Sequence, residues 1–262
     1  MKVTILGCGA SPGVPEIGCH CAVCRSDNPR NKRLRASLHV ETRGKRLLID
    51  TSPDLRVQAL SNGIEDIDAV IYTHDHADHT HGIDDLRIFN VRKGTTIPVY
   101  GDQTTLAALQ NKFAYAFLPK PTRAWYRPAL DAREIPAPLQ PFQVLEVPIL
   151  PILQHHAESS TLGFRIDDFA YSTDTNGFPD ESWPKLEGLK LWIVDCLRYT
   201  PSYTHSRLEL TLQWVEKLKP ELTVLTHMSH DMDYETLSKE LPAGVVAAYD
   251  GMSFEMPDLF FP

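Results

Sequence analysis

The chain has 262 residues, which is enough for one large hydrophobic core or for two smaller domains. Hydrophobic residues make up 42% and charged residues 23%, the proportions of an ordinary soluble globular protein. The formal net charge of −8 argues against binding of nucleic acid by broad electrostatics. One local basic patch is present, and a solvated loop is its simpler interpretation: Arg25, Arg30, Lys32, Arg33 and Arg35.

The lack of a recognisable signal peptide and the pattern of cysteines predict a cytoplasmic protein. The apolar run that follows Lys2 ends at Gly7 and is far shorter than the core of a signal peptide. No apolar stretch approaches the roughly 20 residues that span a bilayer, so we expect no membrane association. The cysteines are odd in number, and three of the five are tightly clustered. This pattern favours a reducing compartment and metal ligation over a disulfide framework.

The first predicted elements are short strands. Residues 2–6 form a strand that leads into a glycine-rich turn at residues 7–15, which lacks the helix and Lys-Ser/Thr pair of a phosphate loop. Residues 36–42 and 45–50 are predicted as a hairpin about Arg43-Gly44, and residues 55–60 have helical character.

Between these elements lies the motif Cys19-His20-Cys21-Ala22-Val23-Cys24. The spacing C-x-C-x-x-C offers three thiolates within six residues, and a fourth ligand would close a tetrahedral structural zinc site. His20 is one candidate for the fourth ligand, although its place between two ligating cysteines makes the geometry tight. A histidine far downstream is the alternative.

The most informative stretch is a short β-branched run, residues 69–73, that ends in a polar cluster. The run suits a buried strand, and the loop at a strand end is a common place for functional residues. The cluster comprises His74, His76, Asp78, His79 and His81. Imidazole and carboxylate donors in this density suit zinc, manganese or iron. In extended backbone His74 and His76 project to one side, and Asp78 and His79 can turn toward a second metal.

The rest of the chain alternates between short strands and helices. Helices are predicted at residues 83–91, 104–117, 207–217 and 234–239, and strands at residues 97–100, 144–153, 161–166, 169–172, 191–195 and 223–226. The proline-rich segment 119–141 excludes a long central helix or strand. We therefore predict one α/β domain spanning residues 1–262, with two mixed sheets between helices.

The segment Thr73 to His79 resembles the T-H-x-H-x-D-H signature of the metallo-β-lactamase superfamily, whose fold is an αββα sandwich with a two-metal site at one edge. The motif C-x-C-x-x-C together with the H-x-x-H of His227 and His230 resembles the PhnP-like phosphodiesterases, and this likeness extends over nearly the whole chain.

The resemblance implies a full set of metal ligands. His156 is expected as the third histidine, with His155 as its rival, and Asp174 is expected to bridge the metals. One metal would take His74, His76, His156 and Asp174, and the other Asp78, His79, Asp174 and His227. Two such cations can share a hydroxide and polarise a phosphoryl oxygen. Mixed nitrogen and oxygen ligation does not choose between manganese and zinc.

The resemblance also implies roles for residues outside the two catalytic metals. His230 would complete a structural zinc site with Cys19, Cys21 and Cys24. His205 would protonate the departing alkoxide and so act beside Asp78 and Asp174 in catalysis. Asp195 could orient His205. Asp50 could support the metals from behind, or it could cap the helix that begins near Pro53.

Together these features predict a metal-dependent phosphodiesterase that cleaves a small cyclic or nucleotide-like phosphodiester. The alternatives are a nuclease resembling tRNase Z, a hydrolase of esters, thioesters or lactones, and a non-enzymatic metal-binding protein. The oligomeric state is left open, with a homodimer as one alternative.

Overall fold

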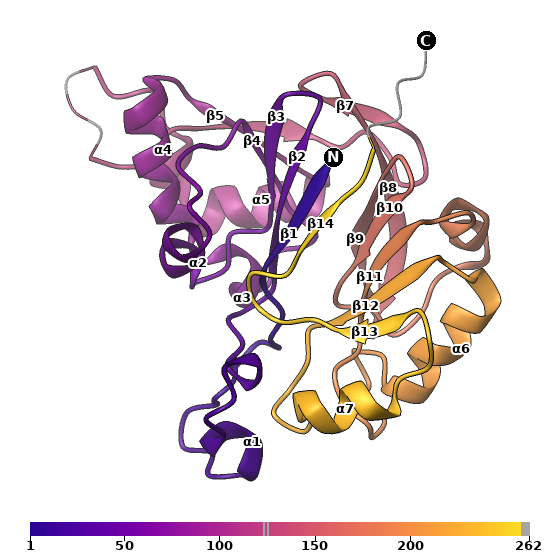
Figure 1. Cartoon of the computed structure of the whole chain (residues 1–262). Helices are drawn as coiled ribbons and strands as arrows, with labels where there is room; N and C mark the ends of the chain where they lie inside the picture. The colour runs from indigo at the N-terminus through magenta and orange to yellow at the C-terminus, as the bar shows by residue number, and fades with distance from the viewer. Residues whose placement is uncertain (123, 125, 258–262) are drawn as a thin grey trace.

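The computed structural model describes residues 1–122, 124 and 126–257. Two seven-stranded sheets face each other, as Figure 1 shows. The strands of the first sheet are, in spatial order, β14 (Ser253–Glu255), β1 (Lys2–Gly7), β2 (Ser37–Thr42), β3 (Lys45–Ile49), β4 (Ala69–Ile71), β5 (Ile97–Gly101) and β6 (Leu130–Glu134). The strands of the second are β13 (Val245–Ala247), β12 (Leu222–Thr226), β11 (Leu191–Asp195), β10 (Phe169–Ser172), β9 (Ser159–Ile166), β8 (Val147–His156) and β7 (Phe142–Val144).

Helices cover the outer faces of both sheets. The longer ones are α2 (Leu55–Ser61), α4 (Leu86–Lys93) and α5 (Gln103–Lys112) beside the first sheet, and α6 (Leu208–Leu218) and α7 (Tyr234–Glu240) beside the second. Short pieces complete the chain: α1 (Ala22–Arg25), α3 (Ala77–Thr80) and the 3₁₀ turns η1 (Pro29–Asn31), η2 (Ile83–Asp85), η3 (Ala114–Phe117) and η4 (Asp180–Leu186). In the part of the chain described, none of the helices has the length and apolar character needed to cross a bilayer.

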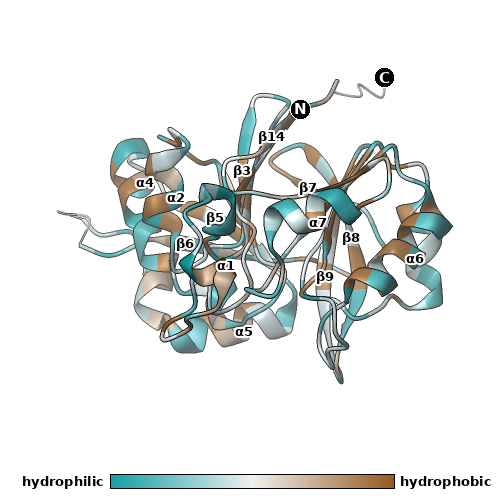
Figure 2. Ribbon diagram, turned by 60° about the horizontal axis from the view of Figure 1, so that its bottom comes forward, coloured by the Kyte–Doolittle hydropathy of each residue, from teal (hydrophilic) through white to brown (hydrophobic). Residues whose placement is uncertain are grey.

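The alternation of side chains along each strand explains the layers. In β3, Leu47 and Ile49 point into the core between the sheets, whereas Leu48 packs with the helices on the outer face. Figure 2 shows the same division, with hydrophobic residues on the inner sides of the helices and hydrophilic ones outside. The predicted sandwich of two mixed sheets between helices is confirmed.

One predicted strand differs from the structure, whereas the described residues of the proline-rich segment form no long central helix or strand, as predicted. Residues 144–153 are not one extended strand, because Leu145 and Glu146 both have positive φ and form a tight turn between β7 and β8. The proline-rich segment contains a strand, β6, at the edge of the first sheet, where it pairs with β5 alone. An edge strand needs few backbone donors, so the flanking prolines are tolerated.

Residues 8–36 form an arm that carries α1 away from the end of the sandwich (Figure 1). Its base is tied to the segment that follows β12. The buried guanidinium of Arg33 donates through Nη1 to Ser229 O at 2.9 Å, and Asn31 Nδ2 donates to Asp233 Oδ2 at 2.8 Å. Asp250 accepts hydrogen bonds from the backbone N–H groups of Cys8 and Leu34. The arm is therefore held beside the end of β12.

A close backbone approach at Gly82 fixes the loop after α3 against the loop after β3. An added Cβ at Gly82 would lie 2.0 Å from Ser52 O, which is far inside van der Waals contact. We expect Gly82→Ala to lower the free energy of unfolding by about 2–3 kcal/mol, because the backbone must shift. The matched control is Gly101→Ala, whose Cβ would meet nothing closer than 3.4 Å and should stay within about 1 kcal/mol of wild type. Urea unfolding of both variants checks this, and equal stabilities would contradict it.

Candidate metal centre

The candidate ligands lie at the ends of strands from both sheets. The loop after β4 carries His74 to His79, and His156 is the last residue of β8. Asp174 and His227 follow β10 and β12, which both pair in parallel with β11 between them. Parallel strands end at the same edge of a sheet, so residues distant in the sequence are brought together there.

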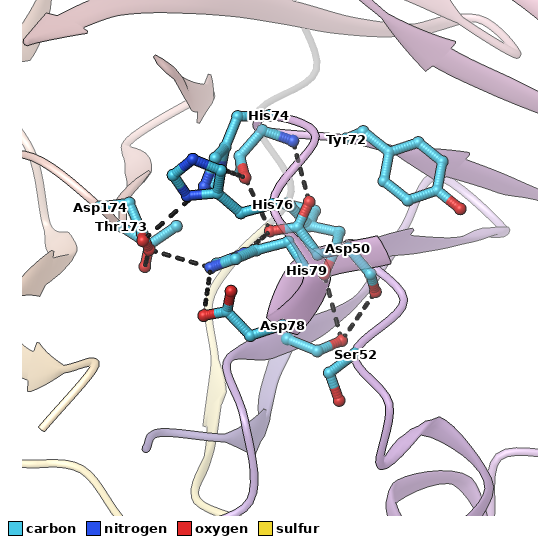
Figure 3. Close-up of polar contacts among 12 residues, drawn as sticks. Asp50, Ser52, Tyr72, His74, His76, Asp78, His79, Thr173 and Asp174 are labelled. Atoms are coloured by element: carbon cyan, nitrogen blue, oxygen red, sulfur yellow. Dashed lines mark hydrogen bonds and ion pairs between the residues drawn. The ribbon is translucent and has the colours of Figure 1, made fainter. Parts of the chain in front are cut away.

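Two groups of donors form at this edge, and they share one carboxylate. The first group is His74, His76, His156 and Asp174, and the second is Asp78, His79, Asp174 and His227. In each group, the candidate ligand atoms lie within 4.8 Å of one another. Figure 3 shows the imidazoles of His74 and His79 directed at Asp174, at Nε2–O distances of 3.8 and 3.0 Å. His156 belongs to the first group, and the neighbouring His155 points outward and is exposed.

Hydrogen bonds at Nδ1 orient three of these imidazoles. His79 Nδ1 lies 2.7 Å from Asp50 Oδ2, and His156 Nδ1 lies 2.8 Å from Thr204 O. Both oxygens can only accept, so each Nδ1 carries the proton. His74 Nδ1 lies 2.9 Å from Thr73 Oγ1, whose own proton goes to Asp50. In the neutral rings of His74 and His156, Nε2 is thereby left with a free lone pair, the form that binds a metal.

Several buried ligand atoms at the centre form no hydrogen bond, although His79 Nε2 lies within ion-pair distance of Asp174. Among the described residues, four buried atoms in the two groups lack a hydrogen bond: His74 Nε2, Asp78 Oδ2, His79 Nε2 and His227 Nδ1. Such unpaired buried groups are costly unless another partner satisfies them. A pair of divalent cations would satisfy all four, and the donor set of imidazoles and carboxylates suits zinc or manganese. The residues present therefore fit a two-metal site.

The protonation states favour the same interpretation. Burial lowers the pKa of His74 well below its usual value and also lowers the pKa of His156 and of His227, so these rings stay neutral at physiological pH. Burial opposes ionisation of Asp174, but the imidazoles of His227 and His79 hold the pKa of Asp174 well below its ordinary value.

His79 differs: burial opposes its protonation, but the carboxylates of Asp174 and Asp50 raise the pKa of His79 well above its usual value. A cation bound at His79 would therefore have to displace a proton, whereas the other three rings are already neutral.

Asp50 supports the centre from behind. Besides His79, its oxygens accept hydrogen bonds from the backbone N–H and the hydroxyl of Thr73, at 2.8 and 2.9 Å. The alternative role as a helix cap does not hold, because α2 begins after Asp54. Asp50 thus joins both ends of the histidine loop to the end of β3.

Three residues at the edge have left-handed backbone. Asp50, Asp174 and His227 have φ values of 64°, 51° and 58°, and each lies just beyond the end of its strand. This conformation is uncommon for residues other than glycine, and it turns the chain sharply at the strand end. It places the side chains of Asp174 and His227 over the edge of the sheet.

His205 lies beside the metal groups without belonging to either. Its Nδ1 is 2.8 Å from Asp195 Oδ2, and its Nε2 is 3.9 Å from Asp174 Oδ2. Burial opposes its protonation, but the carboxylate of Asp195 outweighs burial and raises the pKa of His205 to about 9. The ring also stacks on His227, with centroids 4.8 Å apart. His205 is therefore oriented by Asp195 as the sequence predicts.

The role of Thr204 O at His156 has no counterpart in the sequence analysis, because a backbone carbonyl leaves no signal in residue type.

A cavity of about 330 Å³ opens at this edge. His205 and His227 line its inner end, and the glycine-rich turn of the arm lines the other side. The cavity is large enough for a small organic phosphate and too small to enclose a folded macromolecule.

The cysteine motif forms a separate candidate zinc site on the arm. The sulfurs of Cys19, Cys21 and Cys24 lie within 4.8 Å of one another. The structure does not bring the imidazole of His230 into this group, because its Nδ1 lies 2.8 Å from Glu16 Oε2. The residue itself is adjacent, since its carbonyl oxygen lies 3.9 Å from Cys21 Sγ. The carboxylate of Glu16 therefore competes with the thiolates for this ring.

Comparison with known proteins places this geometry in context. The chain is 36% identical over 255 residues to an octanoyltransferase of Porphyromonas gingivalis. That match covers 96% of this chain and 51% of the relative. The chain thus spans about half the length of this curated relative. It is also 30% identical over 162 residues to a coenzyme PQQ synthesis protein B of Methylorubrum populi, a match that covers 56% of this chain and 52% of that relative.

Solved structures give the same result for the fold. A crystal structure described as a new diphosphatase from the PhnP family matches with 38% identity and a TM-score of 0.90, covering 98% of both chains. Zinc-bound PqqB from Methylobacterium extorquens matches with a TM-score of 0.80 over 98% of this chain and 100% of that chain, at 20% identity, which supports the fold alone. Residues 45–228 match the family described as "Beta-lactamase superfamily domain". The chain therefore belongs to the β-lactamase superfamily and is a PhnP-like protein with the metallo-β-lactamase fold.

Proposed function

We propose that this protein is a phosphodiesterase that uses two divalent metals, manganese or zinc, to hydrolyse a small cyclic or nucleotide-like phosphodiester. The observation that carries the proposal is the position of Asp174. Its carboxylate belongs to both donor groups and so can hold two cations side by side. Paired cations suit the displacement of an oxygen leaving group at phosphorus.

The chain's own residues have distinct tasks in this proposal. His74, His76 and His156 would hold one cation, Asp78, His79 and His227 would hold the other, and Asp174 would hold both. When bound there, the cations would supply a water of lowered pKa and neutralise charge on the phosphoryl oxygens. Asp50 and Thr204 keep the imidazoles in the ligand tautomer. His205, fixed by Asp195, is placed to give a proton to the departing oxygen.

The cavity and the charge of the molecule support a small substrate. A tRNA nuclease needs an extended basic surface, whereas this chain has a net charge of −8. The relative with 38% identity is described as a diphosphatase, which supports phosphorus as the reacting atom.

The octanoyltransferase relative favours acyl chemistry as the second candidate. The metal groups could also polarise the carbonyl of a thioester or ester. The match leaves half of that relative uncovered, so its transferase activity can reside outside the shared part.

A turnover assay separates the two candidates. We expect metal-dependent release of p-nitrophenol from bis-p-nitrophenyl phosphate by protein loaded with Mn²⁺ or Zn²⁺. We expect no metal-dependent cleavage of an octanoyl thioester under the same conditions. Thioester cleavage without phosphodiester cleavage would reverse the assignment.

Removal of a ligand should abolish turnover without unfolding the chain. His74→Ala and Asp174→Ala should lower the metal-dependent kcat by about 100-fold or more, because each removes a donor that neighbouring side chains cannot replace. His155→Ala is the matched control, since this histidine is outside both donor groups. Metal content and circular dichroism are measured alongside the rate. A folded His74→Ala protein with unchanged turnover would refute the ligand assignment.

His205 should matter most for poor leaving groups. We expect His205→Asn to slow hydrolysis of adenosine 2′,3′-cyclic phosphate by about 100-fold or more, because its alkoxide must be protonated as it departs. The same variant should slow bis-p-nitrophenyl phosphate by less than about 10-fold, because p-nitrophenolate leaves as a stable anion. Equal losses on the two substrates, with metal content unchanged, would argue against proton donation.

A structural zinc on the arm is the third metal of the proposal, with Cys19, Cys21 and Cys24 as ligands and His230 as the fourth once it leaves Glu16. We expect Cys21→Ser to lower the zinc content by about one equivalent and to lower the melting temperature, because structural zinc contributes folding free energy. Elemental analysis of protein purified without added metal measures this. Cys8→Ala serves as the control, because Cys8 is buried in the core. An unchanged zinc content in Cys21→Ser would disprove the site.

A further inference from the structure

A second cavity, which we call the outer groove, lies between α2 and α4 on the outer face of the first sheet (Figure 1). Its volume is about 500 Å³, within the range of small-molecule sites. Leu55 and Phe89 are buried at its floor, whereas Leu60 and Ile88 are 68% and 54% exposed at its walls. Large apolar side chains that stay open to water around one groove indicate a surface that another molecule covers.

The outer groove is separate from the metal centre. Among the described residues, none of the candidate metal ligands lines it. The two cavities also differ in chemistry, because imidazoles line the first and aliphatic and guanidinium groups line the second. A ligand in the outer groove therefore takes no part in the proposed hydrolysis.

Two guanidinium groups in the outer groove have no carboxylate partner. Arg92 is neutralised, since its Nη2 donates to Glu65 Oε2 at 2.9 Å. Burial raises the pKa of Asp85, and the positive charges of Arg56 and Arg87 oppose this rise, so both arginines lie near that carboxylate. In the part of the chain described, however, neither Arg56 nor Arg87 forms an ion pair. Both therefore keep donors for an external anion.

The outer groove is cationic at one end and apolar along the rest. Arg56 and Arg87 share the end near Asp85. Leu60 lies about one helical turn beyond Arg56 on α2, and Ile64 follows it along the same cavity. The chain as a whole has a net charge of −8, so this local positive charge is a distinct feature. The matching ligand has an anionic head and one apolar tail.

The size of the outer groove excludes a protein partner bound there alone. α2 and α4 have 7 and 8 residues, which makes them about 10 and 12 Å long. Two helices of about 10 Å width offer a face of roughly 250 Å². A standard interface buries about 800 Å² on each partner. A second copy of the chain is also disfavoured, because its own arginines would meet like charges.

We propose that the outer groove binds a free fatty acid. The carboxylate lies between Arg56 and Arg87, whose guanidinium groups donate paired hydrogen bonds to it. The acyl chain runs over the buried floor and between Leu60 and Ile88, where it removes exposed apolar surface from water. The proposal goes beyond the phosphodiesterase activity and does not depend on it.

Calorimetric titration with sodium carboxylates tests the proposal, at concentrations where each carboxylate is monomeric. From hexanoate to decanoate we expect the affinity to rise about 2- to 4-fold per methylene, because each buried methylene adds hydrophobic binding energy of that size. The affinity should level off for chains that outgrow the groove, and acetate should not bind. Methyl resonances of Leu60 and Ile88 should shift on addition of decanoate.

Variants separate the head and tail contacts. Arg56→Ala and Arg87→Ala should each lower the affinity for decanoate by about 10-fold, because each removes a charge-assisted hydrogen bond. Leu60→Gln should lower it by about 5-fold or more through the tail. Arg207→Ala is the matched control and should keep the wild-type affinity, since its guanidinium pairs with Glu209 outside the groove. Melting temperatures show whether each variant is folded.

Two further measurements exclude other binding modes. A carboxylate can also bind a catalytic metal, so Asp174→Ala protein should keep the wild-type affinity for decanoate. Cosedimentation with vesicles of phosphatidylglycerol and phosphatidylcholine should show no binding that depends on Arg56 or Arg87. Vesicle binding without decanoate binding would replace the fatty acid by a membrane surface and so refute the proposal.

The proposal is overturned if wild-type protein binds no decanoate, or if Arg56→Ala and Arg87→Ala both bind it as tightly as wild type. Loss of decanoate binding in Asp174→Ala would also overturn it. Each of these outcomes leaves the phosphodiesterase assignment standing, because Arg56→Ala should hydrolyse bis-p-nitrophenyl phosphate at the wild-type rate. Absence of that hydrolysis in the wild type would, in turn, leave the fatty acid site standing.

Discussion

The burial of the Asp174 carboxylate is the constraint on which the rest of the site depends. A carboxylate that is only 2% exposed must be neutralised, and here imidazoles from several strand ends surround it. His79 approaches it to 3.0 Å and His227 to 3.4 Å. Without cations, the same arrangement leaves unpaired donors at the centre of the molecule. Bound cations would therefore satisfy both the buried carboxylate and the unpaired donors around it.

Support for this centre comes from groups outside the two donor sets. Asp50 links the histidine loop to β3, and Thr204 O fixes His156 from the loop that also carries His205. The left-handed residues at the strand ends aim their side chains over the sheet edge. Backbone strain of this kind persists only where surrounding structure enforces it, and here two packed sheets do so. The precision of the site thus derives from the sandwich as a whole.

The arm gives the site its outer wall. Its base is fixed by Arg33 and Asp250, so the glycine-rich turn faces His205 and His227 across the cavity. A metal on the cysteine motif would stiffen the far end of the same arm.

The sequence pattern predicted two sheets between helices, and it placed His74, His76, Asp78 and His79 together because a buried strand followed by H-x-H-x-D-H gathers imidazole and carboxylate donors at one strand end. The distant candidate ligands His156, Asp174 and His227 followed from the resemblance to the metallo-β-lactamase superfamily. Strand alternation allowed only one of His155 and His156 to face the centre, and the preference for His156 rested on the family resemblance. Only the tertiary structure decided that Glu16 holds the His230 ring away from the thiolates and that a turn divides β7 from β8. The contact between Glu16 and His230 joins segments distant in the chain, and the turn depends on how β7 and β8 pair. Local residue patterns carry no information about such contacts.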